Sequence, residues 1–66
     1  MTPEQRKALD LAAAALEARA DQHRHRALEA PPDMATIYRD SASLCEAAAL
    51  TLRGMTSIGP ELQAAA

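Results

Sequence analysis

The sequence predicts an all-α fold: an antiparallel hairpin of two helices, near residues 3–29 and 34–53. Alanine accounts for 17 of the 66 residues, whereas Val, Phe and Trp are absent. Strands are stabilised by β-branched and aromatic side chains, of which this chain has few. The Pro31-Pro32 pair separates two segments rich in good helix formers, because Pro cannot continue a helix. A connection this short favours antiparallel helices.

The first helix begins with a local capping signal. Thr2 can cap the free N–H groups, Pro3 suits the first helical position, and Gln5 can complete a capping box. Smaller and apolar residues then recur in steps of four and three, which places them along one side of the helix. They are Leu9, Ala13, Leu16, Ala20, His23, Ala27 and Ala30.

The second helix is expected to run from Met34 to about Arg53. Asp33 stands where an N-cap belongs. Gly54 stands where a left-handed cap would end the helix, with Met55 folding back toward Leu50. A helical wheel predicts an apolar arc on this segment. Its centre is Ile37, Ser41, Leu44, Ala48 and Leu52, and Met34, Tyr38 and Cys45 widen it.

Residues 55–66 are expected to form an irregular or short helical tail of a single domain, residues 1–66. Pro60 suits the first position of a terminal turn, and Ile58 and Leu62 could pack over the hairpin. A tail that folds back as a third helix would give a three-helix monomer.

The preferred hypothesis is instead self-association, because a two-helix hairpin covers only one side of each helix. The chain has 15 large apolar side chains, counting Leu, Ile, Met, Tyr and Cys. Pairing of two hairpins into a four-helix bundle would cover them. The residues predicted for this self-association seam are Leu9, Leu16, His23, Ile37, Leu44, Ala48 and Leu52.

No residue set predicts catalysis, a metal site or a cofactor. His23 and His25 point to opposite sides of a helix, so they cannot bind one ion together. Cys45 has no His or Lys within a helical turn to activate it, and is expected to be a small buried apolar residue. Two glycines five residues apart cannot form a phosphate-binding loop.

Possible contacts to a partner come from aromatic and basic side chains. Tyr38 and Arg39 belong to the residue types that often dominate interface energy. Arg24 and Arg26 form a small basic cluster, which with His25 and Arg39 could hold a phosphate compound. Leu11 and Leu28 project away from the first helix's stripe and could form a second interface if they are contiguous.

The charge pattern limits the class of partner. A net charge of −2 disfavours nucleic-acid binding, and no uncharged run is long enough to span a bilayer. The N-terminal residues do not resemble a signal peptide, so we expect a cytoplasmic protein. The predicted function is a small non-enzymatic protein-interaction module, acting as a self-associating adaptor or regulatory subunit. The alternative is a phage or mobile-element inhibitor of one heterologous host defence or regulatory protein.

Overall fold

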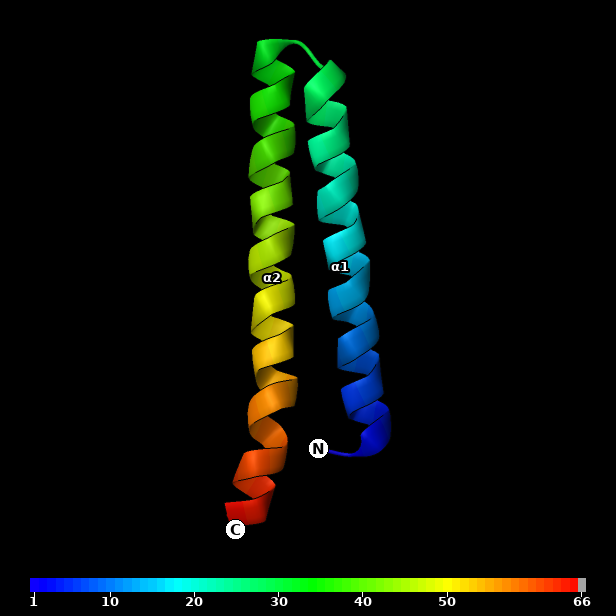
Figure 1. Cartoon of the computed structure of the whole chain (residues 1–66), viewed down its shortest axis with the longest axis vertical. Coiled ribbons are helices and arrows are strands. Elements are labelled where there is room, and N and C mark those ends of the chain that lie inside the picture. The colour runs from blue at the N-terminus through cyan, green and yellow to red at the C-terminus, as the bar shows by residue number, and fades with distance from the viewer. Residues whose placement is uncertain (66) are drawn as a thin grey trace.

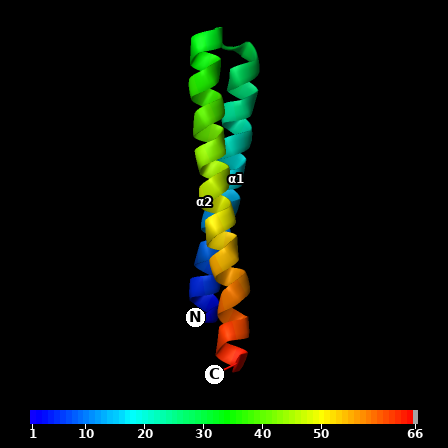
Figure 2. The same cartoon turned by 90° about the vertical axis from the view of Figure 1, so that its left-hand side faces the viewer.

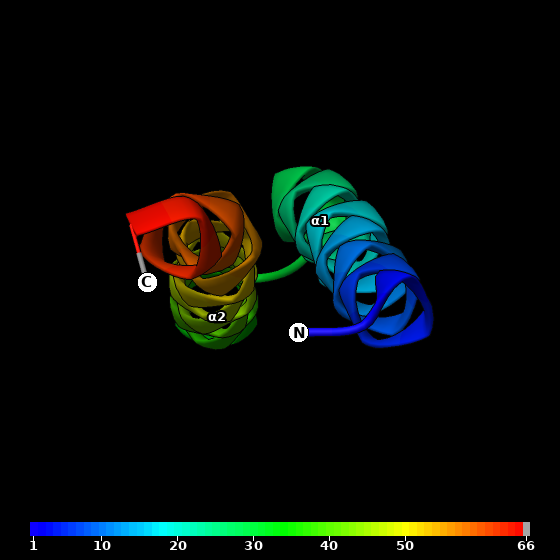
Figure 3. The ribbon, with the colours of Figure 1, turned by 90° about the horizontal axis from the view of Figure 1, so that it is seen from below.

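The computed structural model is a hairpin of two long antiparallel helices, α1 (Pro3–Glu29) and α2 (Pro32–Ala65). The backbone is described for residues 1–65 and the side chains for residues 1–56. The chain turns at one end of the molecule, and α2 extends past the start of α1 at the other end (Figure 1). The helices cross at a shallow angle, as Figures 2 and 3 show. The predicted all-α hairpin is therefore confirmed.

Local signals fix both ends of α1, as the sequence predicts. The Gln5 backbone N–H donates to Thr2 Oγ1 at 3.1 Å, and the Thr2 N–H donates to Gln5 Oε1 at 2.9 Å. These two bonds form the predicted capping box. At the other end Ala30 is extended, with φ −87° and ψ 155°, because the following proline disfavours the helical conformation.

The start of α2 differs from the prediction by two residues. The helix begins at Pro32 rather than Met34, and the Ala35 N–H donates to the Pro31 carbonyl at 2.8 Å. Pro32 fits the first turn because its missing N–H would have no partner there. Asp33 consequently lies inside the first turn, where its carboxylate faces the positive end of the helix dipole, and is not the N-cap.

The predicted end of α2 is wrong. Gly54 does not adopt a positive φ, and the helix continues through it to Ala65. The backbone of residues 55–65 therefore extends α2, which excludes the three-helix alternative. Glycine weakens a helix by about 1 kcal/mol but does not by itself end one. The predicted packing of Ile58 and Leu62 lies outside the described side chains.

The contact between the helices is built on alanine. Among the described side chains no large residue is fully buried, and the core consists of alanines that are 0–3% exposed. They recur every seven residues, twice in α1 and three times in α2. They are Ala13, Ala20, Ala35, Ala42 and Ala49. A seven-residue repeat keeps one stripe of each helix facing its neighbour.

Larger, half-buried residues alternate with the alanines along this contact. The His23 and Tyr38 rings stack with centroids 6.1 Å apart and planes inclined by 25°. Because the helices are antiparallel, steps of seven from this pair place Leu16 level with Cys45. A further step places Leu9 level with Leu52, and all of these residues are half-buried.

The contact face of α2 is thus rotated away from the predicted arc. Ile37 is 56% exposed and Leu44 72% exposed, and Ala48 is also exposed. Helices approach closely only where side chains are small, so the alanine stripe of α2 faces α1 in place of its bulkier neighbours.

Candidate interaction surfaces

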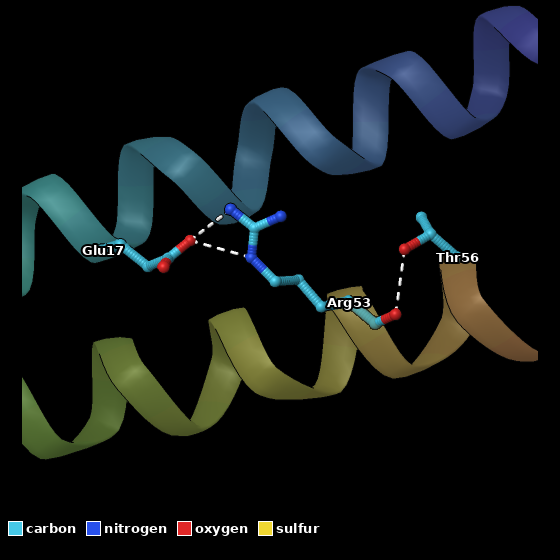
Figure 4. A network of polar contacts seen from close by, with 3 residues as sticks. All are labelled: Glu17, Arg53 and Thr56. Atoms are coloured by element: carbon cyan, nitrogen blue, oxygen red, sulfur yellow. Dashed lines mark hydrogen bonds and ion pairs between the residues drawn. The ribbon is translucent and has the colours of Figure 1, made fainter.

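An ion-paired flank runs along one side of the helix contact. The Arg24 guanidinium lies 2.6 Å from the Glu46 carboxylate and 3.9 Å from that of Asp21. Seven residues away along each helix, Arg53 donates to Glu17, with its Nε 2.9 Å from Oε1 (Figure 4). The Thr56 hydroxyl donates to the Arg53 carbonyl at 2.9 Å, within α2. Both cross-helix pairs join α1 to α2 on the same side.

The Arg24–Glu46 pair shifts the titration of both partners. The hydrogen bond from Arg24, reinforced by its charge, lowers the pKa of the Glu46 carboxyl. The same hydrogen bond raises the pKa of the Arg24 guanidinium. Both side chains are therefore held in their charged forms, which keeps this flank polar over a wide range of pH.

The positions of these charged residues around each helix show which residues lie on the opposite flank of the hairpin. Every charged residue of the two cross-helix pairs stands four positions after a core alanine, for example Glu17 after Ala13 and Glu46 after Ala42. Because the helices are antiparallel, residues that stand at the same number of positions from a core alanine lie on the same side of the hairpin in both helices. Residues one position before or two positions after a core alanine lie on the other side, about 140–160° around each helix from the paired charged residues.

This second side is the apolar flank. Its α2 part is uncharged from residue 34 to residue 55 at these offsets, and its α1 part is alanine in the middle of the helix. Arg19 and Gln22 continue the α1 part toward the turn. The apolar flank consists of Ala12, Ala15, Met34, Ile37, Leu44, Ala48 and Met55, with the uncharged residues Ser41 and Thr51 between them. The four large residues among them are 41–72% exposed.

The seven residues predicted for the self-association seam divide between two places. Leu9, Leu16, His23 and Leu52 lie half-buried in the contact between α1 and α2, whereas Ile37, Leu44 and Ala48 lie on the apolar flank. The structure brings each group together within one chain. Their contact with a second copy stays a prediction.

The predicted partner contacts are dispersed. Arg24, already paired with Glu46, lines a shallow depression with Ala27, Leu28 and Arg39 on the ion-paired flank. Arg26 and His25 line a separate depression with Asp21 and Gln22. The basic residues therefore do not form one anion-binding cluster.

Tyr38 is half-buried against His23 rather than free to dock elsewhere. The His23 Nδ1 atom is buried and has no hydrogen-bond partner among the described residues. Cys45 is free and half-buried in the helix contact, close to the prediction of a small buried residue. In the described part of the chain, no three His, Cys, Asp or Glu residues gather as metal ligands would.

The remaining exposed leucines are scattered. Leu11 is 67% exposed and Leu28 82% exposed, but they lie 17 positions apart, roughly 25 Å along α1. They are therefore not one contiguous surface. Leu50, 72% exposed, lines a depression with the charged residues Glu17, Asp21 and Glu46 on the ion-paired flank.

Comparisons with known proteins add no identity. No family model matches the chain, and no curated protein or solved structure is significantly similar to it. No helix within the described residues combines the length and apolar character that crossing a bilayer requires.

Proposed function

We propose that this protein is a non-enzymatic interaction module that works by pairing with a second copy of itself, forming a four-helix bundle. The observation that carries the proposal is the composition of the core, which among the described side chains contains only alanines while large apolar residues face solvent. Such a bundle buries a second side of each helix, which one hairpin leaves open.

The exposed area of the chain supports pairing. A compact monomer of this mass would expose roughly 4,000 Å², whereas this chain of 7.0 kDa exposes 4893 Å². The excess of roughly 850 Å² is close to the ~800 Å² that one partner contributes to an interface of standard size. Pairing of two copies would thus bring the exposed area per chain to that of a compact protein.

The shape of the chain points the same way. Its dimensions are 52 × 17 × 10 Å and its radius of gyration is 15.3 Å. A compact domain of 66 residues is expected to have a radius of gyration of about 11 Å. A second hairpin packed alongside would thicken the shortest dimension without lengthening the molecule.

The fully buried residues supply only a small free energy of apolar burial within one copy. Five buried alanine methyl groups contribute about 4 kcal/mol, at ~0.8 kcal/mol each. Each large apolar side chain contributes about 1.5–3 kcal/mol when fully buried. Covering residues such as Ile37 and Leu44, each more than half exposed, is therefore an important source of stabilisation that a single hairpin does not use.

The test is the mass of the protein in solution. Light scattering coupled to size-exclusion chromatography, with sedimentation equilibrium across micromolar concentrations, should give twice the chain mass of 7.0 kDa. A folded species that keeps the single-chain mass across that range would contradict the proposal.

A further inference from the structure

We infer that the second copy packs on the apolar flank, with α2 of one copy antiparallel to α2 of the other about a twofold axis level with residue 46. This inference rests on the proposed function, and adds to it the surface, the direction and the register of the pairing. The ion-paired flank then faces solvent in the assembled molecule.

The α2 part of the apolar flank has the continuity that an interface needs. Its residues recur in steps of three and four over 18 positions, roughly 27 Å of helix. From 37 to 55 they are Ile37, Ser41, Leu44, Ala48, Thr51 and Met55. None carries a charge, so the stripe can face its own copy without repulsion between like charges. The ion-paired flank, by contrast, would bring charged side chains of two copies together.

The order of residues along the stripe favours a second copy over an unrelated partner. A twofold axis at residue 46 places Leu44 opposite Ala48 of the other copy, a large residue against a small one. It places Ser41 opposite Thr51, so that two hydroxyl groups meet, and Ile37 opposite Met55. An isologous interface requires such self-complementarity, because the same surface serves both copies.

The available area fits this occupant. The roughly 850 Å² by which the chain exceeds a compact monomer corresponds to one side of a standard interface. The half-buried residues of the helix contact extend the surface, because Leu16, Cys45 and Leu52 lie at its edge toward the apolar flank. Ala15 of α1 stands level with the proposed axis, where its small side chain leaves room for the second hairpin.

Two leucines provide a matched test. Leu44 and Leu50 belong to the same helix and are each 72% exposed, but they lie about 120° apart, on the apolar and the ion-paired flank respectively. Leu44→Asp should weaken pairing roughly 100-fold or more, since it places a carboxylate inside the interface. Leu50→Asp should leave the dimer intact. Mass by light scattering and helicity by circular dichroism are measured for both.

A second measurement covers the case in which Leu44→Asp unfolds the chain. In a Cys45→Ala background, a single cysteine is introduced as Leu44→Cys or Leu50→Cys and labelled with pyrene maleimide. Two labels at position 44 would be offset by only four residues, roughly 6 Å along the bundle, so excimer emission is expected. Labels at position 50 would point away from each other and give monomer emission only.

The outcomes separate the two proposals. A wild-type protein that is monomeric overturns both the proposed function and this inference. A wild-type dimer that Leu50→Asp dissociates and Leu44→Asp does not, or excimer emission from position 50 alone, overturns the inference and leaves self-association standing. A dimer without excimer emission at position 44 overturns the register. Pairing lost with Leu44→Asp, together with the excimer at position 44, supports it.

Discussion

Enlarging a core alanine tests whether the hairpin depends on close approach of its helices. Ala42 is 0% exposed and, by the register of the contact, stands level with Ala20, which is 1% exposed. Ala42→Leu adds three carbon atoms at a fully buried position. Overpacking of this kind costs about 1–3 kcal/mol, because helices must separate or side chains must leave their preferred rotamers.

The control for this change is Ala47→Leu, because Ala47 is exposed on the same helix and leucine there should alter stability by less than about 0.5 kcal/mol. Thermal unfolding followed by circular dichroism is the assay. For a domain of this size about 1 kcal/mol corresponds to about 4–8 °C, so a cost of ~2 kcal/mol lowers Tm by about 8–16 °C. A raised Tm for Ala42→Leu would refute the close-packed alanine contact, since it would mean that the site has room for leucine.

Three further changes test the ends of the helices and the ion-paired flank. Gly54→Ala should raise the free energy of unfolding by about 0.5–1 kcal/mol in a denaturant titration, because Gly54 is helical and an added methyl group would meet nothing within 4 Å; destabilisation would indicate a left-handed cap instead. Thr2→Ala should cost about 1 kcal/mol in the same titration, through loss of the capping box, and an unchanged midpoint would contradict that role. Because the pKa of Glu46 is lowered from 4.5 in the folded chain, its pairing with Arg24 stabilises the protein above that pH and the contribution is lost as pH falls below it. Glu46→Gln should therefore reduce the acid-induced fall in Tm, and a fall equal to that of wild type would contradict this.

The bounds of α1 could be predicted because they depend on neighbouring residues alone. The capping box involves Thr2 and Gln5, which are three positions apart, and the end of the helix is imposed by Pro31 on the residue before it. Neither signal requires knowledge of the other helix. The predicted start of α2 was close to the observed one for the same reason. The prediction placed Asp33 at the N-cap, whereas the helix already begins at Pro32.

The end of α2 could not be predicted in the same way. Gly54 is compatible both with a left-handed cap and with a continuing helix. The free energies of these two conformations differ little, so the residues around Gly54 decide which one forms. The predicted cap required Met55 to fold back toward Leu50, but Met55 is 49% exposed on the apolar flank. The hydroxyl of Thr56, two residues after the glycine, instead donates to the Arg53 carbonyl within the uninterrupted helix.

The face of α2 that contacts α1 is rotated away from the apolar arc that the sequence predicts, and the reason lies in the size of the side chains. A helical wheel weights large side chains, so Ile37 and Leu44 determine the direction of the predicted arc. The contact between two helices also depends on how closely their backbones approach, and alanines at every seventh position of both helices favour the face that carries them. That repeat, visible at Ala35, Ala42 and Ala49, was the signal for the contact within the chain. Once the alanines occupy that contact, the larger residues at neighbouring offsets are left on one flank, where a single copy provides nothing to cover them.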